Sequence, residues 1–179
     1  MNNKGSGFAP LMIVMVVSML ITSWWNSIPI IKDSVHSALD PSLGIFLQWN
    51  LVWGMMIIVF LITLMTTVIQ KYTTDQKALK ELREEQKILQ EELKKYEKNP
   101  EKIAELTKKK LEFIPKTFKL TSRTVLFTGI PFILFFRWFS DVFTAMGEPK
   151  FFGFMNWFWF YFLFTMIFSS FLRKWMKVV

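Results

Sequence analysis

The residues best suited to chemistry in this 179-residue chain are charged and polar side chains placed inside long apolar segments. Arg137 is the sharpest case, because an ionisable group within a membrane segment is costly unless it faces water, protein or a partner. One interpretation makes Arg137 a functional cation. In the other, it lies one turn from the membrane surface, pairs with Asp141 at the i,i+4 spacing and extends towards water.

Uncharged polar residues form a second set, which could line a water-filled groove. Ser and Thr in membrane helices often bond to neighbouring helices instead, so both interpretations remain open. The second and fourth apolar segments carry such groups towards their predicted cytosolic ends, as a groove open to the cytosol requires. Together with Arg137, the predicted groove residues are Gln48, Asn50, Thr63, Thr66, Thr67, Gln70, Thr128, Asn156, Thr165 and Ser169, and Thr121, Ser122, Thr124 and Ser170 are further candidates.

Two other groups could contact large partners. Methionine offers a flexible, polarizable surface for varied apolar segments, although ordinary lipid-facing packing would also explain these residues. A lysine cluster could bind the phosphates of ribosomal RNA, or it could mark an anionic lipid surface. We predict that Met55, Met56, Met65 and Met166 contact an apolar segment of a substrate protein. We predict that Lys108, Lys109 and Lys110 contact the ribosome or lipid.

Composition excludes much familiar active-site chemistry. Cysteine is absent and His36 is the one histidine, which excludes a thiol nucleophile, a disulfide framework and a Cys or His metal cluster. We therefore expect no catalytic residues, no metal and no cofactor, and a protein that is not an enzyme. The chain is 52% hydrophobic and 17% aromatic, with 20 Phe and 8 Trp, which indicates a polytopic membrane protein.

Four apolar segments should position these residues. The first, 8–31, has no charge until Lys32 and is long enough to span a bilayer. A cleaved secretory signal is an alternative, and so is a segment whose end lies along the outer interface at Trp24, Trp25 and Pro29. A polar loop follows at 32–41. The second segment, 43–69, should run directly into a charged region, and segments 124–145 and 151–172 should form the closing pair, the former bent at Gly129–Pro131.

The charged region 71–122 predicts a coiled-coil hairpin of two antiparallel helices. Its first helix has an apolar seam with Gln86 at one position, and the helix should end before Asn99–Pro100, where a second helix begins. The seam residues are Tyr72, Leu79, Leu82, Leu89, Leu93 and Tyr96 on the first helix and Ile103, Leu106 and Phe113 on the second.

Charge distribution predicts the orientation. The region from Lys71 to Arg123 has 15 basic and 10 acidic residues, and the carboxyl-terminal tail adds Arg173, Lys174 and Lys177. Lys and Arg favour the cytoplasmic side, so the hairpin and the carboxyl terminus should be cytoplasmic. The amino terminus should be cytoplasmic as well if segment 8–31 spans the membrane.

This arrangement resembles the YidC-type membrane protein insertases and is most similar to the archaeal YidC-like proteins, whose eukaryotic relatives include the third subunit of the endoplasmic-reticulum membrane complex. The likeness covers about 43–179. It rests on the order of segments and on Gly129–Pro131 with Trp138, 159–163 and 171–173. The resemblance implies a lipid-exposed groove, open to the cytosol and closed outside, with a cation that attracts polar substrate flanks. By position, Arg137 resembles that cation.

We therefore predict an all-α membrane protein with a three-helix YidC-like transmembrane core, a cytosolic antiparallel coiled-coil hairpin and an additional N-terminal hydrophobic helix. The predicted regions are 1–42, 43–70, 71–122 and 123–179. The predicted function is insertion of nascent membrane proteins at the cell membrane. Expected partners are nascent chains, the ribosome, the lipid bilayer and a possible membrane subunit that completes the groove. An ion-conducting oligomer and a scaffold that recruits cytosolic proteins are the alternatives.

Overall fold

The computed structural model describes residues 9–96 and 99–178, and its named elements there are all helices. Phe8, the rest of the predicted cytoplasmic amino terminus, and positions 97–98 and 179 lie outside the described residues. The elements are α1 (Ala9–Trp24), α2 (Pro29–Leu39), the π-helical turn η1 (Asp40–Gly44), α3 (Ile45–Trp49), α4 (Leu51–Thr73), α5 (Gln76–Lys95), α6 (Pro100–Ala145) and α7 (Trp157–Met176).

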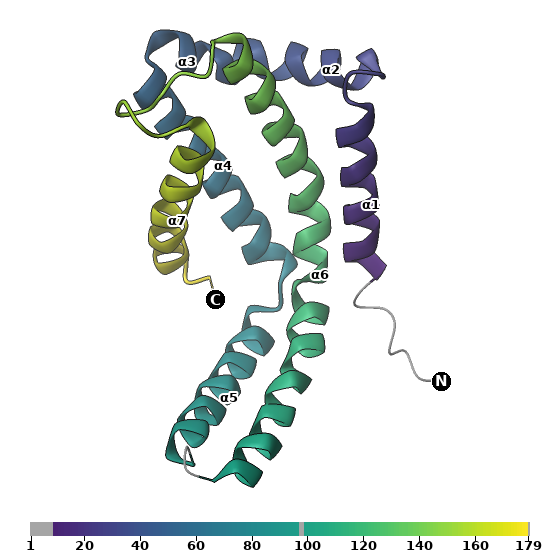
Figure 1. Cartoon of the computed structure of the whole chain (residues 1–179), viewed down its shortest axis with the longest axis vertical. Helices are drawn as coiled ribbons and strands as arrows, with labels where there is room; N and C mark the ends of the chain where they lie inside the picture. Colours follow the sequence, from purple (N-terminus) through teal and green to yellow (C-terminus); the bar gives the residue numbers. More distant parts are fainter. Residues whose placement is uncertain (1–8, 97–98, 179) are drawn as a thin grey trace.

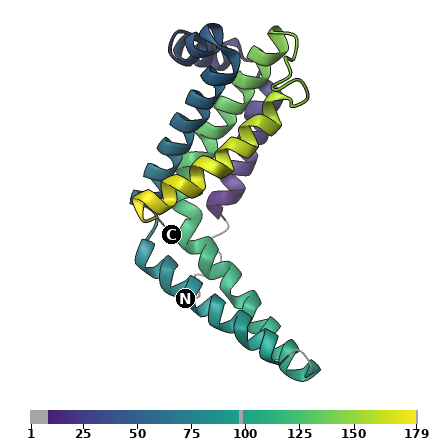
Figure 2. The same cartoon turned by 90° about the vertical axis from the view of Figure 1, so that its left-hand side faces the viewer.

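Two parts of the molecule share α6. Helix α5 and the first half of α6 lie side by side and project from a bundle that α1, α4, α7 and the second half of α6 form (Figures 1 and 2). Helices α2 and α3 lie across the opposite end of the bundle (Figure 1). We call these two ends of the bundle the hairpin end and the α2 end.

The helices confirm an integral membrane protein in outline. Both α4 and α6 are long and apolar enough to cross a membrane, and α1 together with 29–49 would add a third span as a pair bent by 94°. Helix α7, 20 residues long, is not among these candidates. The structure thus has two or three candidate spans in the part of the chain that it describes.

The N-terminal segment is two helices rather than the single span that the sequence predicts over 8–31. Helix α1 ends at Trp24, and α2 begins at Pro29, whose missing N–H is tolerated in a first turn. The bend of 94° agrees with the alternative in which the end of this segment turns along the membrane surface.

The prediction of a polar loop over 32–41 is wrong, because α2 and η1 make this region helical. Apolar residues recur there at every fourth position, Ile31, Val35 and Leu39, and the last two pack against the bundle core. Such a stripe stabilises a helix even when charged residues occupy its other faces.

The second apolar segment is also interrupted, at Asn50. The Asn50 Oδ1 atom accepts hydrogen bonds from the backbone N–H groups of Val52 at 3.1 Å and Trp53 at 3.0 Å, which caps α4. Just inside α4, Gly54 allows α3 to pass closely: a Cβ atom there would lie 2.0 Å from the carbonyl oxygen of Phe46. The first long bundle helix therefore begins at Leu51 rather than at Leu43.

Helix α4 does not run into the hairpin helix, contrary to the sequence prediction. The chain is extended at Thr74, and the Asp75 side chain caps α5 through the N–H of Ala78 at 3.0 Å. Tyr72 consequently belongs to α4 and is 80% exposed, so its placement in the hairpin seam is wrong. The central residues of the predicted seam are buried, namely Leu79, Leu82 and Leu89 of α5 and Leu106 of α6.

Helix α6 is continuous where the sequence suggested a boundary between the hairpin and a third apolar segment. Its 46 residues, at about 1.5 Å each, extend about 69 Å and pass through Pro115 and Pro131 without ending. The hairpin and the bundle are therefore joined by one unbroken helix, which changes direction where the two parts meet (Figure 2).

Aromatic side chains fill the α2 end of the bundle. Trp138, Phe139 and Phe143 of α6 are at most 1% exposed. The Trp157 ring of α7 lies 6.0 Å from Phe139 and 5.8 Å from Phe143, between ring centroids. Rings from both helices therefore meet at this end.

Candidate functional site

A cavity opens at the hairpin end of the bundle, between α4, α6 and α7. Helix α7 packs chiefly against α4, and the ring contact between Phe132 and Tyr161, 6.1 Å between centroids, joins α6 to α7 above the cavity. The cavity has a volume of about 420 Å³. Its lining residues are Thr66, Thr67, Gln70, Thr74, Thr121, Thr124, Val125, Thr128, Gly129, Phe132, Ser169 and Arg173.

Hydroxyl groups give the cavity its polar character. Thr67 donates to the carbonyl oxygen of Thr63 at 2.7 Å, and Thr128 donates to that of Thr124 at 2.8 Å. These donors are thus satisfied one turn back along their own helices rather than by a neighbouring helix. The lone pairs of the hydroxyl oxygens remain available to water or to a polar ligand.

A group of three threonines closes one side of the cavity, where α4 meets α5. The hydroxyl oxygens of Thr73 and Thr74 lie 2.7 and 2.6 Å from that of Thr124 on α6. This contact fixes the extended residue between α4 and α5 onto the long helix. The α4–α5 break is therefore a defined structural feature at the mouth of the cavity.

Among the described residues, Arg173 is the one charged residue that lines the cavity. It is half-buried on the last turn of α7, and its Nε atom is buried with no hydrogen-bond partner among the described residues. The sequence prediction placed Arg173 in the basic tail. Its spacing of four from Ser169 puts the two residues on one face of α7, and that signal could have identified it.

Arg137 lies away from the cavity, on the part of α6 near the α2 end. Its guanidinium carbon lies 5.5 Å from the centroid of the Trp25 ring, and its Nε atom is buried without a hydrogen-bond partner. The predicted pair with Asp141 is not found, because Asp141 accepts from Trp25 Nε1 at 2.8 Å and pairs with Lys32 at 3.2 Å.

Polar contacts of this kind hold α2 across the end of α6. The Nε2 atom of His36 lies 3.3 Å from Asp141, and its Nδ1 atom lies 3.1 Å from Asp40. Trp138 donates from Nε1 to Asp40 at 2.7 Å. With the aromatic packing beneath them, these contacts close the bundle at the α2 end.

The structure brings only some of the predicted groove residues together. Those that line the cavity are Thr66, Thr67, Gln70, Thr128 and Ser169, joined by Thr121 and Thr124. The others lie elsewhere: Gln48 is exposed on α3, Asn50 and Asn156 cap α4 and α7 near the α2 end, Thr63 is buried one turn from Thr67, Thr165 lies one turn before Ser169, and Arg137 faces Trp25.

The predicted hydrophobic contacts differ in exposure. Met55 is fully buried in the core, and Met56 and Met65 are half-buried on α4. Met166 on α7 is 59% exposed. Met166 is thus the member of the set that is accessible to a segment arriving from the lipid.

The lysine cluster lies on the hairpin portion of α6. Lys108, Lys109 and Lys110 are all exposed, and Lys109 pairs with Glu105 at 3.4 Å. No ion pair of Lys108 or Lys110 is found among the described residues. Two of the three charges are therefore available to an external phosphate.

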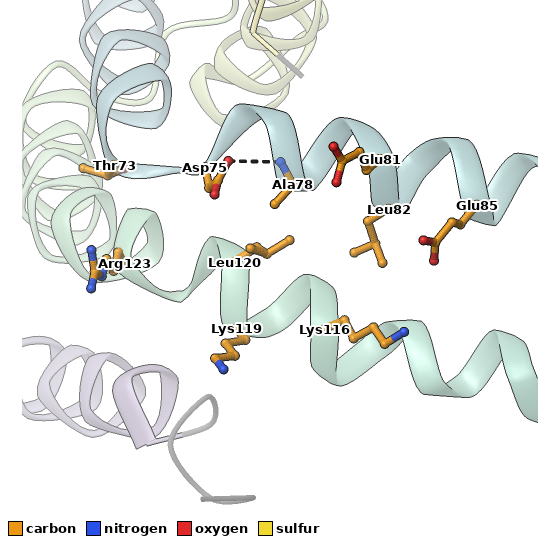
Figure 3. A pocket seen from close by; sticks show the side chains of 10 residues that line it. All are labelled: Thr73, Asp75, Ala78, Glu81, Leu82, Glu85, Lys116, Lys119, Leu120 and Arg123. Atoms are coloured by element: carbon orange, nitrogen blue, oxygen red, sulfur yellow. Dashed lines mark hydrogen bonds between the residues drawn. The ribbon is translucent and has the colours of Figure 1, made fainter.

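A second depression, of about 490 Å³, lies at the base of the hairpin (Figure 3). Its carboxylates come from α5 and the residue before it, and its cations come from α6. Lys116 lies 5.4 Å from the centroid of the Phe113 ring. The charged lining residues are Asp75, Glu81, Glu85, Lys116, Lys119 and Arg123, and no ion pair within 4.0 Å joins the two helices here in the described structure.

Comparison with known proteins identifies a relationship over most of the chain. A family model described as integral membrane protein EMC3/TMCO1-like matches residues 36–151, which include α4, α5 and α6 in full. No curated protein and no solved structure matches the chain significantly. Within residues 9–96 and 99–178, no group of three His, Cys, Asp or Glu side chains could hold a metal ion.

Proposed function

The chain belongs to the EMC3/TMCO1-like family of integral membrane proteins, part of the Oxa1/YidC/Alb3 insertase superfamily, and we propose that it assists the insertion of newly made membrane proteins. The mechanism is physical and forms no covalent bond. The cavity at the hairpin end accepts a short polar flank of a nascent chain while the adjacent apolar segment enters the lipid. Within the superfamily, we propose that the protein is similar to the archaeal YidC-like proteins.

One observation carries the proposal: one end of the bundle is packed with aromatic rings, and the other contains a cavity. Rings of α6 and α7 fill the α2 end, whereas hydroxyl groups line a cavity of about 420 Å³ at the hairpin end. Moving one charge through the bilayer centre costs about 2.5 to 3.5 kcal/mol on insertion scales. Halving that cost raises the rate about tenfold, because about 1.4 kcal/mol corresponds to a factor of ten.

The proposal needs α7 to cross the membrane as the third core helix and needs the hairpin to be cytosolic. Helix α7 is 20 residues long, which at about 1.5 Å per residue matches a hydrocarbon core of about 30 Å. The basic excess of the hairpin and of the tail after Phe171 favours the cytoplasmic side for both. The cavity would then open to the cytosol at the cell membrane.

Arg173 takes the role that the sequence analysis assigned to Arg137. A guanidinium at the mouth of the cavity attracts acidic groups in the flank and holds them near the entrance. Its unpartnered Nε atom offers a donor that a substrate carboxylate could use. Substrates with acidic flanks should therefore benefit most, and exposed Met166 would contact the apolar segment that follows.

The hairpin serves in this proposal as the arm that reaches the ribosome. Lys108 and Lys110 are exposed towards the tip of the hairpin, where they would meet RNA phosphates rather than lipid. Phosphate contacts release counterions, so replacing Lys108 and Lys110 with glutamate should weaken co-sedimentation with ribosomes and flatten its dependence on salt. Replacing Lys116 and Lys119, nearer the bundle, is the matched control and should have less effect.

A pore through a single chain has less support. Polar groups line the hairpin end, but buried rings occupy the α2 end, so the described residues offer no continuous polar path along the bundle. An oligomer or a partner subunit could still complete the open side of the cavity between α6 and α7. The insertase proposal requires neither.

Filling the cavity tests the proposal. Ser169 lines the cavity, whereas Ser170, the next residue of α7, is exposed on the outside of the helix. We expect Ser169→Phe to slow insertion of a substrate with a polar flank into proteoliposomes and Ser170→Phe to leave it unchanged. Both variants add the same ring, so equal effects, at equal protein abundance and melting temperature, would contradict a role for the cavity.

A further inference from the structure

We propose that the corner where the end of α1, α2 and α6 meet binds one anionic phospholipid from the leaflet at the α2 end. Its acyl chain occupies an apolar cavity between α2 and α6, and its phosphate pairs with Arg137. This site is separate from the cavity at the hairpin end. It also does not depend on which side of the membrane the hairpin occupies.

The acyl chain has a cavity of its own. A space of about 310 Å³ lies between α2 and the middle of the bundle half of α6, lined by Val35, Leu39, Ile130, Pro131 and Leu134 among others. Its lining is almost wholly apolar, so a water molecule there would lack hydrogen-bond partners. Because α2 lies across the end of the bundle (Figure 1), a cavity lined by α2 and by Ile130 and Leu134 of α6 would face lipid chains if the bundle spans the membrane.

The headgroup has a cation on the same face of α6. Arg137 lies three residues beyond Leu134 and seven beyond Ile130, both of which line the cavity, and these spacings place all three on one side of the helix. The order of these residues along α6 also matches the order of groups in a lipid, because Arg137 is nearer the α2 end than Ile130 and Leu134 are. A phospholipid has the same order, with its charge outward and its chain inward.

The charge of Arg137 is not neutralised within the described residues. Its Nε atom is buried without a hydrogen-bond partner, and its guanidinium lies over the Trp25 ring at 5.5 Å. The carboxylate one turn away, Asp141, is already engaged by Lys32 at 3.2 Å and by Trp25 at 2.8 Å. A phosphate is a suitable counterion because a guanidinium can donate two parallel hydrogen bonds to it.

Photocrosslinking of lipids tests the proposal on the full chain. The protein is reconstituted into phosphatidylcholine vesicles that contain a trace of phosphatidylglycerol with a diazirine near the middle of one acyl chain, or the same probe with a phosphatidylcholine headgroup. Mass spectrometry then locates the adducts. We expect the anionic probe to label 34–39 and 130–135 about tenfold more than the zwitterionic probe does.

Four variants separate the outcomes. Arg137→Gln should remove the preference for phosphatidylglycerol, whereas Lys150→Gln, which removes an exposed cation near the same end, should retain it. Ala38→Phe, which fills the cavity, should abolish labelling of 130–135 by either probe, and Ser37→Phe on the exposed side of α2 should not. Equal labelling by the two probes, a preference that survives Arg137→Gln, or adducts confined to other regions would overturn the proposal. None of these readouts involves a nascent chain, so the proposed insertase function could fail or stand independently.

Discussion

Replacing Arg173 with glutamine should slow insertion of substrates with acidic flanks while sparing neutral ones. Arg173 is half-buried at the mouth of the cavity, so its interaction with a carboxylate lies between two limits. At a separation of about 5 Å, two unit charges attract by about 0.8 kcal/mol in water and about 3 kcal/mol at an effective dielectric constant of about 20. An intermediate value of about 1.4 kcal/mol corresponds to a tenfold change in rate.

The assay compares two substrates that differ only in their flanks, one with aspartate and one with asparagine, during insertion into proteoliposomes. With Arg173→Gln, we expect the aspartate substrate to insert about tenfold more slowly and the asparagine substrate to change less than twofold. Lys174→Gln is the matched control, because it removes the same charge from the exposed neighbouring position.

Two results would refute this reasoning. If Lys174→Gln slows the aspartate substrate as much as Arg173→Gln does, the general charge of the tail acts rather than the cavity. If Arg173→Gln slows both substrates equally and lowers the melting temperature of the purified protein, Arg173 is a structural residue. The melting temperature of each variant therefore has to be measured alongside the insertion rate.

Three further predictions concern the fold and its orientation. Gly54→Ala places a Cβ atom 2.0 Å from a backbone oxygen of α3 and should cost about 1 to 3 kcal/mol, seen as a lower Tm, whereas Gly44→Ala, with its nearest atom at 3.8 Å, should be tolerated. Asp141→Asn removes the charge that holds α2 on α6, so trypsin should cleave α2 faster than in the unaltered protein. A cysteine introduced at Glu148 should react with an impermeant thiol reagent in intact cells, while one at Glu92 should be shielded; the opposite pattern would reverse the proposed orientation.

A local signal in the sequence was sufficient to predict where α6 begins. Asn99–Pro100 does begin a helix, and the Asn99 side chain caps it through the N–H of Lys102 at 3.2 Å. The same signals were present but overlooked at Asn50 and Asp75, which are both favourable N-cap residues. Asn50 lies within a long apolar run, and Asp75 lies within a heptad-like pattern of apolar residues. Because each pattern continues on both sides of the cap residue, it predicts a single helix where the structure has a break.

The continuity of α6 could not be predicted from local propensity. Proline normally disfavours a helix interior, yet Pro115 and Pro131 both lie inside this helix. Packing against α5 on one half and against α1 and α4 on the other compensates for the lost backbone hydrogen bonds. Such tertiary stabilisation depends on residues distant in the sequence, which a local pattern does not contain.

The sequence singled out Arg137 as the cation of the site, whereas the charged residue that lines the cavity among the described residues is Arg173. Depth along an apolar segment singled out Arg137, but the role of a residue also depends on which face of its helix it occupies. Arg137 faces Trp25, whereas Arg173, which looked like part of a tail, shares a face with Ser169. Of the predicted threonines, Thr66 and Thr67 of α4 and Thr128 of α6 line the cavity, and their role in binding stays a prediction.

The most direct test of the insertase account is to record which side of α6 meets a nascent chain. A photoreactive amino acid is placed at Thr128, which lines the cavity, or at its neighbour Phe127, which is 61% exposed outside the cavity, and ribosomes carrying a stalled membrane protein are added. The account predicts adducts between position 128 and the polar flank of the nascent chain, and few or none from position 127. Equal adducts from both positions, or none from position 128, would contradict it.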